Sequence, residues 1–355
     1  MSELTAGNIV VTRVTEAEES GWKDFVSRQK HATFFHDLRW KGVIESGLGH
    51  RTHYLIAKQR EDIVGVLPLA EVRSRLFGHR LVSNPCCVYG GPLAETADAE
   101  SALLTEARKL AVLLGVNALE IRPLPGDAGE SCYAPEEWHT KDLYVTFRKP
   151  IFEDRDKNLS SIPRKQRAMV RKGIASGLHS GVTNDVRRFY RIYAESVRNL
   201  GTPVFSLRYF KALCNAFPDS VELAMVMHNG LDIATVMSFY FRDEVLPYYG
   251  GSRRVARDLK GNDFMYWDLM SRAAERGCRL FDFGRSKRGT GSFSFKKNWG
   301  FVATPLPYRY DLVVCEKVPD VNPTNPKYQL LIAGWKMMPL PLANAVGPLL
   351  ARHLG

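Results

Sequence analysis

One order of secondary-structure patterns occurs twice in this chain, and this repetition constrains the fold more than any other feature. Each copy has a hydrophobic hairpin, a Tyr-Gly-Gly sequence, a helix closed by glycine and a strand that holds an acid. The matched pairs are the hairpins at 53–69 and 222–239, Tyr-Gly-Gly at 89–91 and 249–251, the helix ends at Gly115 and Gly277, and the strands at Glu120 and Asp282. Chance recurrence of hairpins is the alternative, and the length of the match favours duplication. We therefore expect residues 50–122 and 220–283 to be two copies of one α/β unit.

The length of the chain also favours two domains. A single hydrophobic core rarely extends over as many as 355 residues. Hydrophobic residues at 45% and charged residues at 25% are ordinary for a globular protein, and they exclude wholesale disorder and fibrous repeats. We place the domains at residues 1–150 and 151–325, followed by a C-terminal amphipathic helical segment at 326–355. The predicted fold class is α/β with mixed sheets.

The charge balance favours anionic partners. Lys and Arg exceed Asp and Glu by 49 to 38, which gives a net charge of +11. RNA, anionic lipid, nucleotide-sugar and coenzyme A are all partners of this kind. The N-terminal sequence lacks the basic start and apolar core of a secretory signal, so we expect a cytoplasmic protein. In the apolar stretch 330–351, Pro339, Pro341 and Pro348 interrupt any membrane-spanning helix, and we expect broken helices that pack on the body or contact a membrane surface.

Cysteines and histidines predict neither a disulfide framework nor a metal site. Their spacing contains no CxxC motif and no Cys/His ligand pattern, so we expect reduced, mostly buried thiols and structural histidines. The cysteines are Cys86, Cys87, Cys132, Cys214, Cys278 and Cys315.

A basic helix is predicted after the sequence Ser161-Ile162-Pro163, because proline favours the first turn of a helix. Arg164, Arg167 and Arg171 are three and four residues apart and therefore share one stripe of this helix. Such a stripe suits phosphate, and a solvated basic face is an equal alternative. The absence of RRM, KH or zinc-knuckle signatures argues against sequence-specific recognition of nucleic acid.

A glycine-rich basic loop follows the strand that contains Asp282. Glycine permits close approach to the backbone, and the neighbouring cations favour an anion or oxyanion pocket, with a flexible surface loop as the alternative. The sequence is neither a Walker loop nor a dinucleotide fingerprint. The cations are Arg285, Lys287, Arg288, Lys296 and Lys297.

Three segments together resemble the FemAB-type acyltransferases, specifically the branch associated with exosortase and exopolysaccharide loci. They are IPRKQRAMVRKG at 162–173, the helix entry at 260–264, and FDFGRSKRGTGSFSFKKNWGF at 281–301. The resemblance covers nearly the whole chain and implies two tandem GNAT-like domains. It implies transfer of an acyl or aminoacyl group to an amine of an envelope or exopolysaccharide precursor, with no bound cofactor. The co-substrate is acyl-CoA or aminoacyl-tRNA, so tRNA is one implied partner.

The donor remains open because two family features are missing. The helical arm linked with tRNA handling has no counterpart between Gly173 and Leu207, and the GNAT pyrophosphate loop is absent after Tyr249. A non-catalytic adaptor that docks on a polysaccharide-export complex or membrane is the alternative from another class.

The resemblance also suggests roles for individual residues. Lys296, in the FKK segment, would stabilise the oxyanion, and Asp282 would orient the amine or help remove its proton. Other residues would bind substrate. The phosphate of the donor or acceptor would be bound by Arg285 and Lys287, and a cleft between the domains would be lined by Tyr248 and Tyr249. A longer anionic precursor, free or lipid-linked, would be held by Arg164, Arg167 and Arg171.

Overall fold

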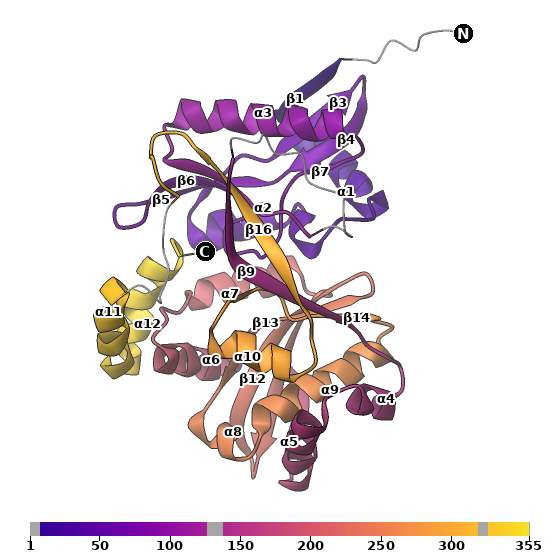
Figure 1. Ribbon diagram of the computed structural model, residues 1–355, viewed down its shortest axis with the longest axis vertical. Helices are drawn as coiled ribbons and strands as arrows, with labels where there is room; N and C mark the ends of the chain where they lie inside the picture. Colours follow the sequence, from indigo (N-terminus) through magenta and orange to yellow (C-terminus); the bar gives the residue numbers. More distant parts are fainter. Residues whose placement is uncertain (1–7, 126–137, 319–325, 355) are drawn as a thin grey trace. The chain divides into compact units, whose positions relative to one another are not determined.

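The computed structural model describes residues 8–125, 138–318 and 326–354, which form two compact units (Figure 1). The first unit comprises Met1–Leu143, Leu306–Val321 and His353–Gly355, and the second comprises Tyr144–Pro305 and Asn322–Arg352. The chain passes from the first unit to the second within strand β9 (His139–Pro150) and returns within strand β16 (Ala303–Leu312). That residues 1–150, 151–325 and 326–355 are separate domains stays a prediction, because compactness does not test independent folding.

The first unit contains two sheets and one long helix. Its strands pair in the orders β1-β3-β4-β7 and β2-β5-β6-β8-β16. Its further elements are β1 (Ile9–Arg13), α1 (Glu19–Arg28), α2 (Trp40–Val43), β2 (Arg51–Thr52), β3 (Leu55–Gln59), β4 (Asp62–Leu67), β5 (Leu69–Ser74), β6 (Gly78–Ser83), β7 (Leu93–Ala94), α3 (Ala97–Leu114) and β8 (Ala118–Ile121).

Local sequence explains these boundaries. The predicted first hairpin is the antiparallel pair β3 and β4, and Pro68 separates β4 from β5 because proline has no N–H for the ladder. Helix α3 begins after Thr96, whose side chain accepts a hydrogen bond from the Ala99 N–H, and it ends at Gly115 in the left-handed conformation. Its apolar face, with Leu103 and Ala107, packs into the core of this unit.

The second unit is built on one sheet with helices on both faces. Its strands pair in the order β10-β11-β12-β13-β14-β9, and β15 also pairs with β9. Its further elements are α4 (Arg155–Ser160), α5 (Arg164–Ala175), β10 (His179–Thr183), α6 (Val186–Leu200), α7 (Leu207–Ala216), β11 (Val221–His228), β12 (Leu231–Phe241), β13 (Glu244–Ser252), α8 (Arg254–Asp258), α9 (Gly261–Glu275), β14 (Leu280–Asp282), β15 (Ser286–Lys287), α10 (Gly291–Asn298), α11 (Pro326–Met337) and α12 (Leu340–Ala351).

Neighbouring residues of β13 identify the two faces of this sheet. A side chain at Gly251 would meet Tyr193 of α6, whereas one at Gly250 would meet Tyr266 of α9. Because successive residues of a strand point to opposite faces, α6 and α9 cover opposite sides. The second predicted hairpin is β11 and β12, joined at Asn229-Gly230, where both residues have positive φ as a tight turn requires.

The two units share the predicted connectivity but not the predicted place of Tyr-Gly-Gly. In both, an antiparallel hairpin is followed by a parallel strand-helix-strand crossover, β6-α3-β8 in the first and β13-α9-β14 in the second. Residues 249–251 lie in β13, but residues 89–91 lie in a buried irregular segment. The correspondence of these sequences is therefore wrong. The chain leaves β6 at Asn84 and Cys86, whose positive φ angles turn it out of the sheet.

The C-terminal segment forms two helices, as predicted, and both pack on α6 of the second unit. Pro339 stands immediately before α12, which explains the break between the helices, while Pro348 lies inside α12 without ending it. Within the described ranges, no helix has the length and apolar character needed to cross a membrane.

Candidate active site

Lys296 of α10 reaches back onto the turn that follows β14. Its Nζ donates hydrogen bonds to the carbonyl oxygens of Phe283 at 2.6 Å, Gly284 at 3.2 Å and Arg285 at 3.1 Å. An ammonium group has three N–H donors, so these acceptors satisfy it completely. Gly284 adopts a left-handed φ of 61°, which turns the chain so that successive carbonyls converge on the lysine.

The surroundings of Lys296 lower its pKa to about 7. Burial of the ammonium is the main cause; Asp282 opposes it by attraction and Arg285 adds repulsion. Lys296 as a whole is half-buried, because part of its aliphatic stem is exposed, whereas the turn encloses its charged end. The ammonium also lies 5.6 Å from the ring centre of Phe147 and 5.7 Å from that of Phe283. This site therefore holds a lysine that changes charge near neutral pH.

Asp282 is buried at the end of β14, directly opposite Arg148 of β9. Its Oδ1 accepts the Gly284 N–H at 2.6 Å, and its Oδ2 lies 3.2 Å from the Arg148 Nε. Arg148 also pairs with Glu244 of β13, whose pKa is raised because burial outweighs the attraction of Arg148. Both oxygens of Asp282 are thus engaged, and the carboxylate holds the turn in place.

Arg285 and Lys287 lie beside the same turn and share one aromatic neighbour. The Arg285 guanidinium carbon is 4.9 Å from the ring centre of Tyr144, and the Lys287 Nζ is 5.8 Å from it. Strand β15 fixes this arrangement because Lys287 pairs with Tyr144 in the ladder with β9. The structure thereby brings together four predicted site residues, Asp282, Arg285, Lys287 and Lys296.

Strands β13 and β14 separate at this point. Within the described strands, their parallel pairing covers Glu244 with Leu280 and Val245 with Phe281. Beyond it, β13 continues to Ser252, while β14 ends at Asp282. Tyr248 forms a bulge in β13, because the register with β12 shifts there. Within the described strands, the pairing of β14 with β13 therefore ends before the bulge at Tyr248.

Tyr248 and Tyr249 belong to an aromatic cluster packed around β13. The Tyr249 hydroxyl is 2.9 Å from that of Tyr209, and its ring also contacts Phe210 of α7. Tyr248 is half-buried and packs on Phe239. Tyr249 is therefore part of the interior of the second unit. The predicted substrate role of both tyrosines stays a prediction.

Tyr266 of α9 was not identified from sequence, yet it connects β13 with the turn. A methyl group at Gly250 would lie 2.7 Å from the Tyr266 hydroxyl, and the ring packs edge-on against Phe283 with centres 4.9 Å apart. Burial raises the pKa of this tyrosine to about 12, so the hydroxyl stays protonated at physiological pH.

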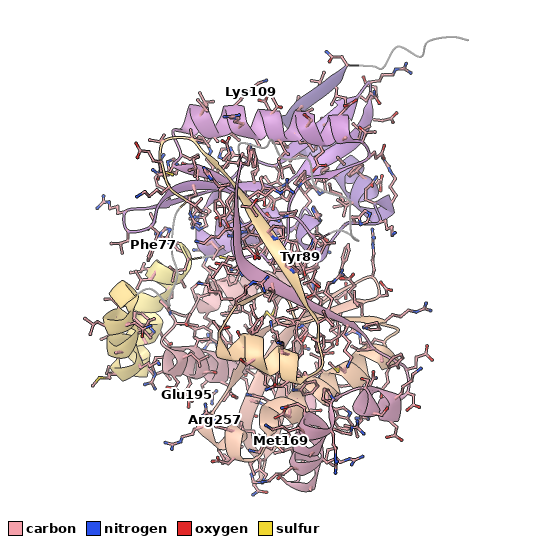
Figure 2. All side chains as sticks on the ribbon, in the orientation of Figure 1. Phe77, Tyr89, Lys109, Met169, Glu195 and Arg257 are labelled. Atoms are coloured by element: carbon pink, nitrogen blue, oxygen red, sulfur yellow. The ribbon has the colours of Figure 1, made fainter. Side chains whose placement is uncertain are left out.

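The three arginines of α5 have different environments (Figure 2, where Met169 marks this helix). Arg164 and Arg171 are exposed. Arg167 instead folds back: its Nη2 donates to the Ser160 carbonyl at 3.0 Å, and its Nε and Nη2 donate to the Ile162 carbonyl at 3.2 and 3.1 Å. Because these bonds stabilise the end of α4, the predicted uniform stripe holds only for the two outer arginines.

Asp263 ties the basic helix to the helix that carries Lys296. Its Oδ1 accepts Gln166 Nε2 of α5 at 2.6 Å and Trp299 Nε1, just after α10, at 3.1 Å. Burial raises the pKa of this carboxyl. Asp263 lies in the helix entry at 260–264 that the sequence indicated, but its partners could not be predicted from that pattern.

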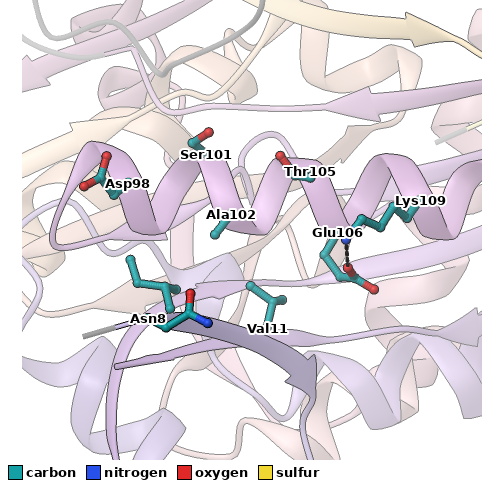
Figure 3. Close-up of a pocket in the computed structure, with 9 residues that line it drawn as sticks. Asn8, Val11, Asp98, Ser101, Ala102, Thr105, Glu106 and Lys109 are labelled. Atoms are coloured by element: carbon teal, nitrogen blue, oxygen red, sulfur yellow. Dashed lines mark hydrogen bonds and ion pairs between the residues drawn. The ribbon is translucent and has the colours of Figure 1, made fainter. Parts of the chain in front are cut away.

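A groove of about 490 Å³ lies in the first unit between β1 and α3 (Figure 3). Asn8, Val11, Asp98 and Ala102 are among its lining residues, and a Lys109–Glu106 pair lies at one end. No predicted site residue lines this groove, so it gives no support to a substrate role.

Cysteines and potential metal ligands offer no additional chemistry in the described part of the chain. Cys86, Cys87 and Cys278 are buried thiols, Cys214 and Cys315 are half-buried, and Cys132 lies outside the described residues. The same ranges contain no group of three His, Cys, Asp or Glu residues placed to hold a metal ion.

Comparison with known proteins places this geometry in context. A family model described as an acetyltransferase (GNAT) domain matches residues 164–297. Among solved structures, FemX aligns with a TM-score of 0.67 at 15% identity, covering 91% of this chain and 100% of FemX. No curated protein matches the sequence.

Two further solved structures share the fold. The C-terminal DUF2156 domain of a putative lysylphosphatidylglycerol synthetase from Agrobacterium fabrum has a TM-score of 0.56 at 13% identity, with 83% of this chain and 92% of that domain covered. A tandem GNAT protein from the clavulanic acid pathway has a TM-score of 0.55 at 12% identity, with 87% and 100% covered. The predicted fold of tandem GNAT-like domains is confirmed. Residues 164–297, which include Asp282 and Lys296, form an acyltransferase domain of the GNAT type.

Proposed function

We propose that this protein transfers an acyl or aminoacyl group to a primary amine of an anionic envelope or exopolysaccharide precursor. One observation carries the proposal: Lys296, with its lowered pKa, stands on the turn of β14 where the pairing of β13 and β14 ends. A buried cation at the point where two parallel strands cease to pair suits a reaction that develops negative charge on oxygen.

In the proposed reaction, one bond to the carbonyl carbon forms and one breaks. The amine nitrogen attacks the carbonyl carbon of an activated ester or thioester, and the carbonyl oxygen becomes an oxyanion. When the intermediate collapses, the carbon–oxygen or carbon–sulfur bond breaks, and the leaving group takes up the proton that the amine gives away. Positioning and oxyanion stabilisation supply most of the catalysis.

Within this proposal, Lys296 stabilises the oxyanion. All three of its donors hold carbonyl oxygens, so the substrate oxygen displaces one of them, and the longer bond to Gly284 is the easiest to exchange. Asp282 favours the charged form of Lys296 and holds the turn in place. This role is more limited than the predicted roles of orienting or deprotonating the amine. Arg285 and Lys287 bind phosphate beside it.

The donor and the setting also belong to the proposal. Acyl-CoA and aminoacyl-tRNA are both activated donors, and the names of the structural neighbours include a tandem GNAT protein and a putative lysylphosphatidylglycerol synthetase. The acceptor is a free or lipid-linked anionic precursor that the exposed Arg164 and Arg171 help to hold. The exosortase branch and a cytoplasmic location rest on the sequence alone.

A transfer assay tests the proposal directly. Purified protein is supplied with labelled acyl-CoA or labelled aminoacyl-tRNA, together with an extract of free and lipid-linked precursors. Label is expected in the precursor fraction from one donor. Lys296→Ala should lower the rate by about 10²- to 10³-fold, the usual loss for one oxyanion donor. Lys297→Ala is the matched control, because Lys297 is the exposed neighbour on the same helix.

Two outcomes would contradict the proposal. Near-normal turnover by a folded Lys296→Ala protein would remove the catalytic lysine. Absence of transfer by the wild-type protein from either donor would favour the adaptor alternative.

A further inference from the structure

The helices α11 and α12 carry an unusual share of the exposed apolar surface. Of the sixteen large hydrophobic residues exposed in the described chain, five lie on these helices. The side chains of Leu330 and Met337 are each 84% exposed, and Leu331 is 67% exposed. Leu342 and Leu349 add a second apolar stripe on α12. Scattered apolar residues are normal on protein surfaces, but such a concentration marks an interaction site.

This exposure does not come from a detached segment. Trp335 of α11 and Ala343, Gly347 and Ala351 of α12 are buried. A methyl group on Gly347 would lie 3.0 Å from the Val204 nitrogen, which shows how closely the helix approaches the loop before α7. The Arg198 Nη1 of α6 also donates to the Lys336 carbonyl at 3.1 Å. The packing therefore fixes which faces point outward.

On α11 the exposed side chains form one stripe. Leu330, Gly334 and Met337 follow one another at intervals of four and three residues, so they share a helical face. Leu331 borders this face on one side. Lys336 is exposed but follows Ile332 by four residues, and a methyl group at Gly201, where α6 ends, would lie 3.1 Å from its Cε. Ile332 and Trp335 point the opposite way, toward α6. We call Leu330, Leu331 and Met337 the α11 stripe.

The charges of this segment select the partner. Residues 326–355 contain Lys327, Lys336 and Arg352 but no aspartate or glutamate. An apolar stripe on a segment whose sequence contains cations and no acid suits the boundary between acyl chains and anionic headgroups. We propose that α11 docks on the surface of an anionic lipid bilayer, with the α11 stripe at the acyl boundary and Lys336 at the headgroups. This inference does not depend on the transfer reaction, because it concerns binding alone.

Vesicle flotation of the full chain tests this docking. The vesicles are phosphatidylcholine alone or phosphatidylcholine with about 30 mol% phosphatidylglycerol, a composition that supplies negative surface potential. We expect binding to the anionic vesicles. Leu330→Ser, Leu331→Ser and Met337→Ser combined should weaken it by at least about tenfold, because three apolar anchors are lost. Lys336→Ala should weaken it by about fivefold, and added salt should do the same.

A matched control separates this stripe from general surface hydrophobicity. Leu76, Leu113 and Leu231 are 74%, 79% and 66% exposed and lie elsewhere, so their combined change to Ser should leave binding unchanged. Circular dichroism and a thermal melt check the fold of each variant, and the single Lys336→Ala variant still tests the proposal if the triple variant does not fold. Wild-type protein that fails to float, or a folded triple variant that binds normally, would overturn the docking. So would a wild-type dimer that the triple variant converts to a monomer, since a second copy would then cover the stripe.

Discussion

Glu120 and Asp282 occupy the same place in the two parallel crossovers, yet their surroundings differ. Each is the third residue of the strand that follows the crossover helix. Glu120 is held by two buried arginines, with Arg80 at 2.7 Å and Arg122 at 2.7 Å. Asp282 pairs with Arg148 and accepts the N–H of Gly284 in the turn that Lys296 caps.

The extent of strand pairing explains this difference. In the first unit, β6 and β8 pair as far as Val82 with Glu120, and β16 pairs with Glu120 on the other side, so strands flank this residue on both edges. In the second unit, the pairing of β13 with β14 stops at Phe281, one residue before Asp282. The comparison teaches that one scaffold position supports either an ion-pair cluster between arginines or a turn that a lysine caps, depending on how far the strands run together.

Breaking the ion-pair cluster should produce the largest effect. We expect Glu120→Gln to lower the free energy of unfolding by about 3–5 kcal/mol, because two buried arginines lose the charge that compensates them. Chemical denaturation monitored by circular dichroism measures this loss. Glu106→Gln is the control, since Glu106 forms an exposed pair with Lys109 and should change stability by about 0.5 kcal/mol at most. Equal effects of the two changes would contradict the role assigned to the cluster.

The turn that Lys296 caps should instead affect the pH dependence of transfer. The pKa of Lys296 is about 7, so the charged form that stabilises an oxyanion disappears as the pH rises through 7. We expect the rate to fall on the alkaline side in wild-type protein. Asp282→Asn should move this fall to lower pH, because the carboxylate raises the pKa of Lys296. A rate that rises through pH 7 would mean that neutral Lys296 acts as a base.

The same lysine makes a prediction for stability. Its pKa is lowered from 10.5 to about 7 in the folded protein. Between these values the unfolded chain binds the additional proton, so the contribution of this group to stability rises with pH across that window. Replacing Lys296 by Met should flatten the rise relative to wild type in melts at pH 7 and pH 10. An unchanged slope would show that the lysine titrates normally.

The smallest effects should separate the arginines of α5. Arg171→Ala should weaken apparent substrate affinity severalfold and reduce its salt dependence, because an exposed cation acts through screened attraction. Arg167→Ala should lower stability by about 1 kcal/mol instead, since its guanidinium holds the end of α4. Steady-state assays at two salt concentrations and thermal melts distinguish these outcomes. A salt-dependent affinity loss in Arg167→Ala alone would reverse the assignment.

Local sequence signals predicted much of the fold. Gly115 ends α3, and Asn229-Gly230 joins β11 to β12, because caps and turns depend on adjacent residues. The clustering of Asp282, Arg285 and Lys296 was also predictable, since all three lie within the segment 282–296.

Long-range contacts were beyond such reasoning. Arg148 faces Asp282 only because β9 pairs antiparallel with β14, and no local pattern sets that register. Nor does helical spacing show that Arg167 turns back toward α4 instead of outward, because its acceptors are carbonyls in the preceding turn. The misplaced Tyr-Gly-Gly match has the same origin: identical letters lie in a strand in one unit and in an irregular segment in the other.

The single oxygen of Asp263 that accepts both Gln166 and Trp299 has a consequence for energetic coupling. A polyanion that binds α5 and displaces it would strain the hydrogen bond between Gln166 and Asp263. The hydrogen bond from Trp299 connects the same carboxylate to the end of α10, the helix that bears Lys296. The affinity for an anion at the basic helix and the position of Lys296 therefore depend on each other, and a coupling free energy measures this dependence. In a double-mutant cycle, replacing Gln166 and Lys296 together would differ from the sum of the separate losses.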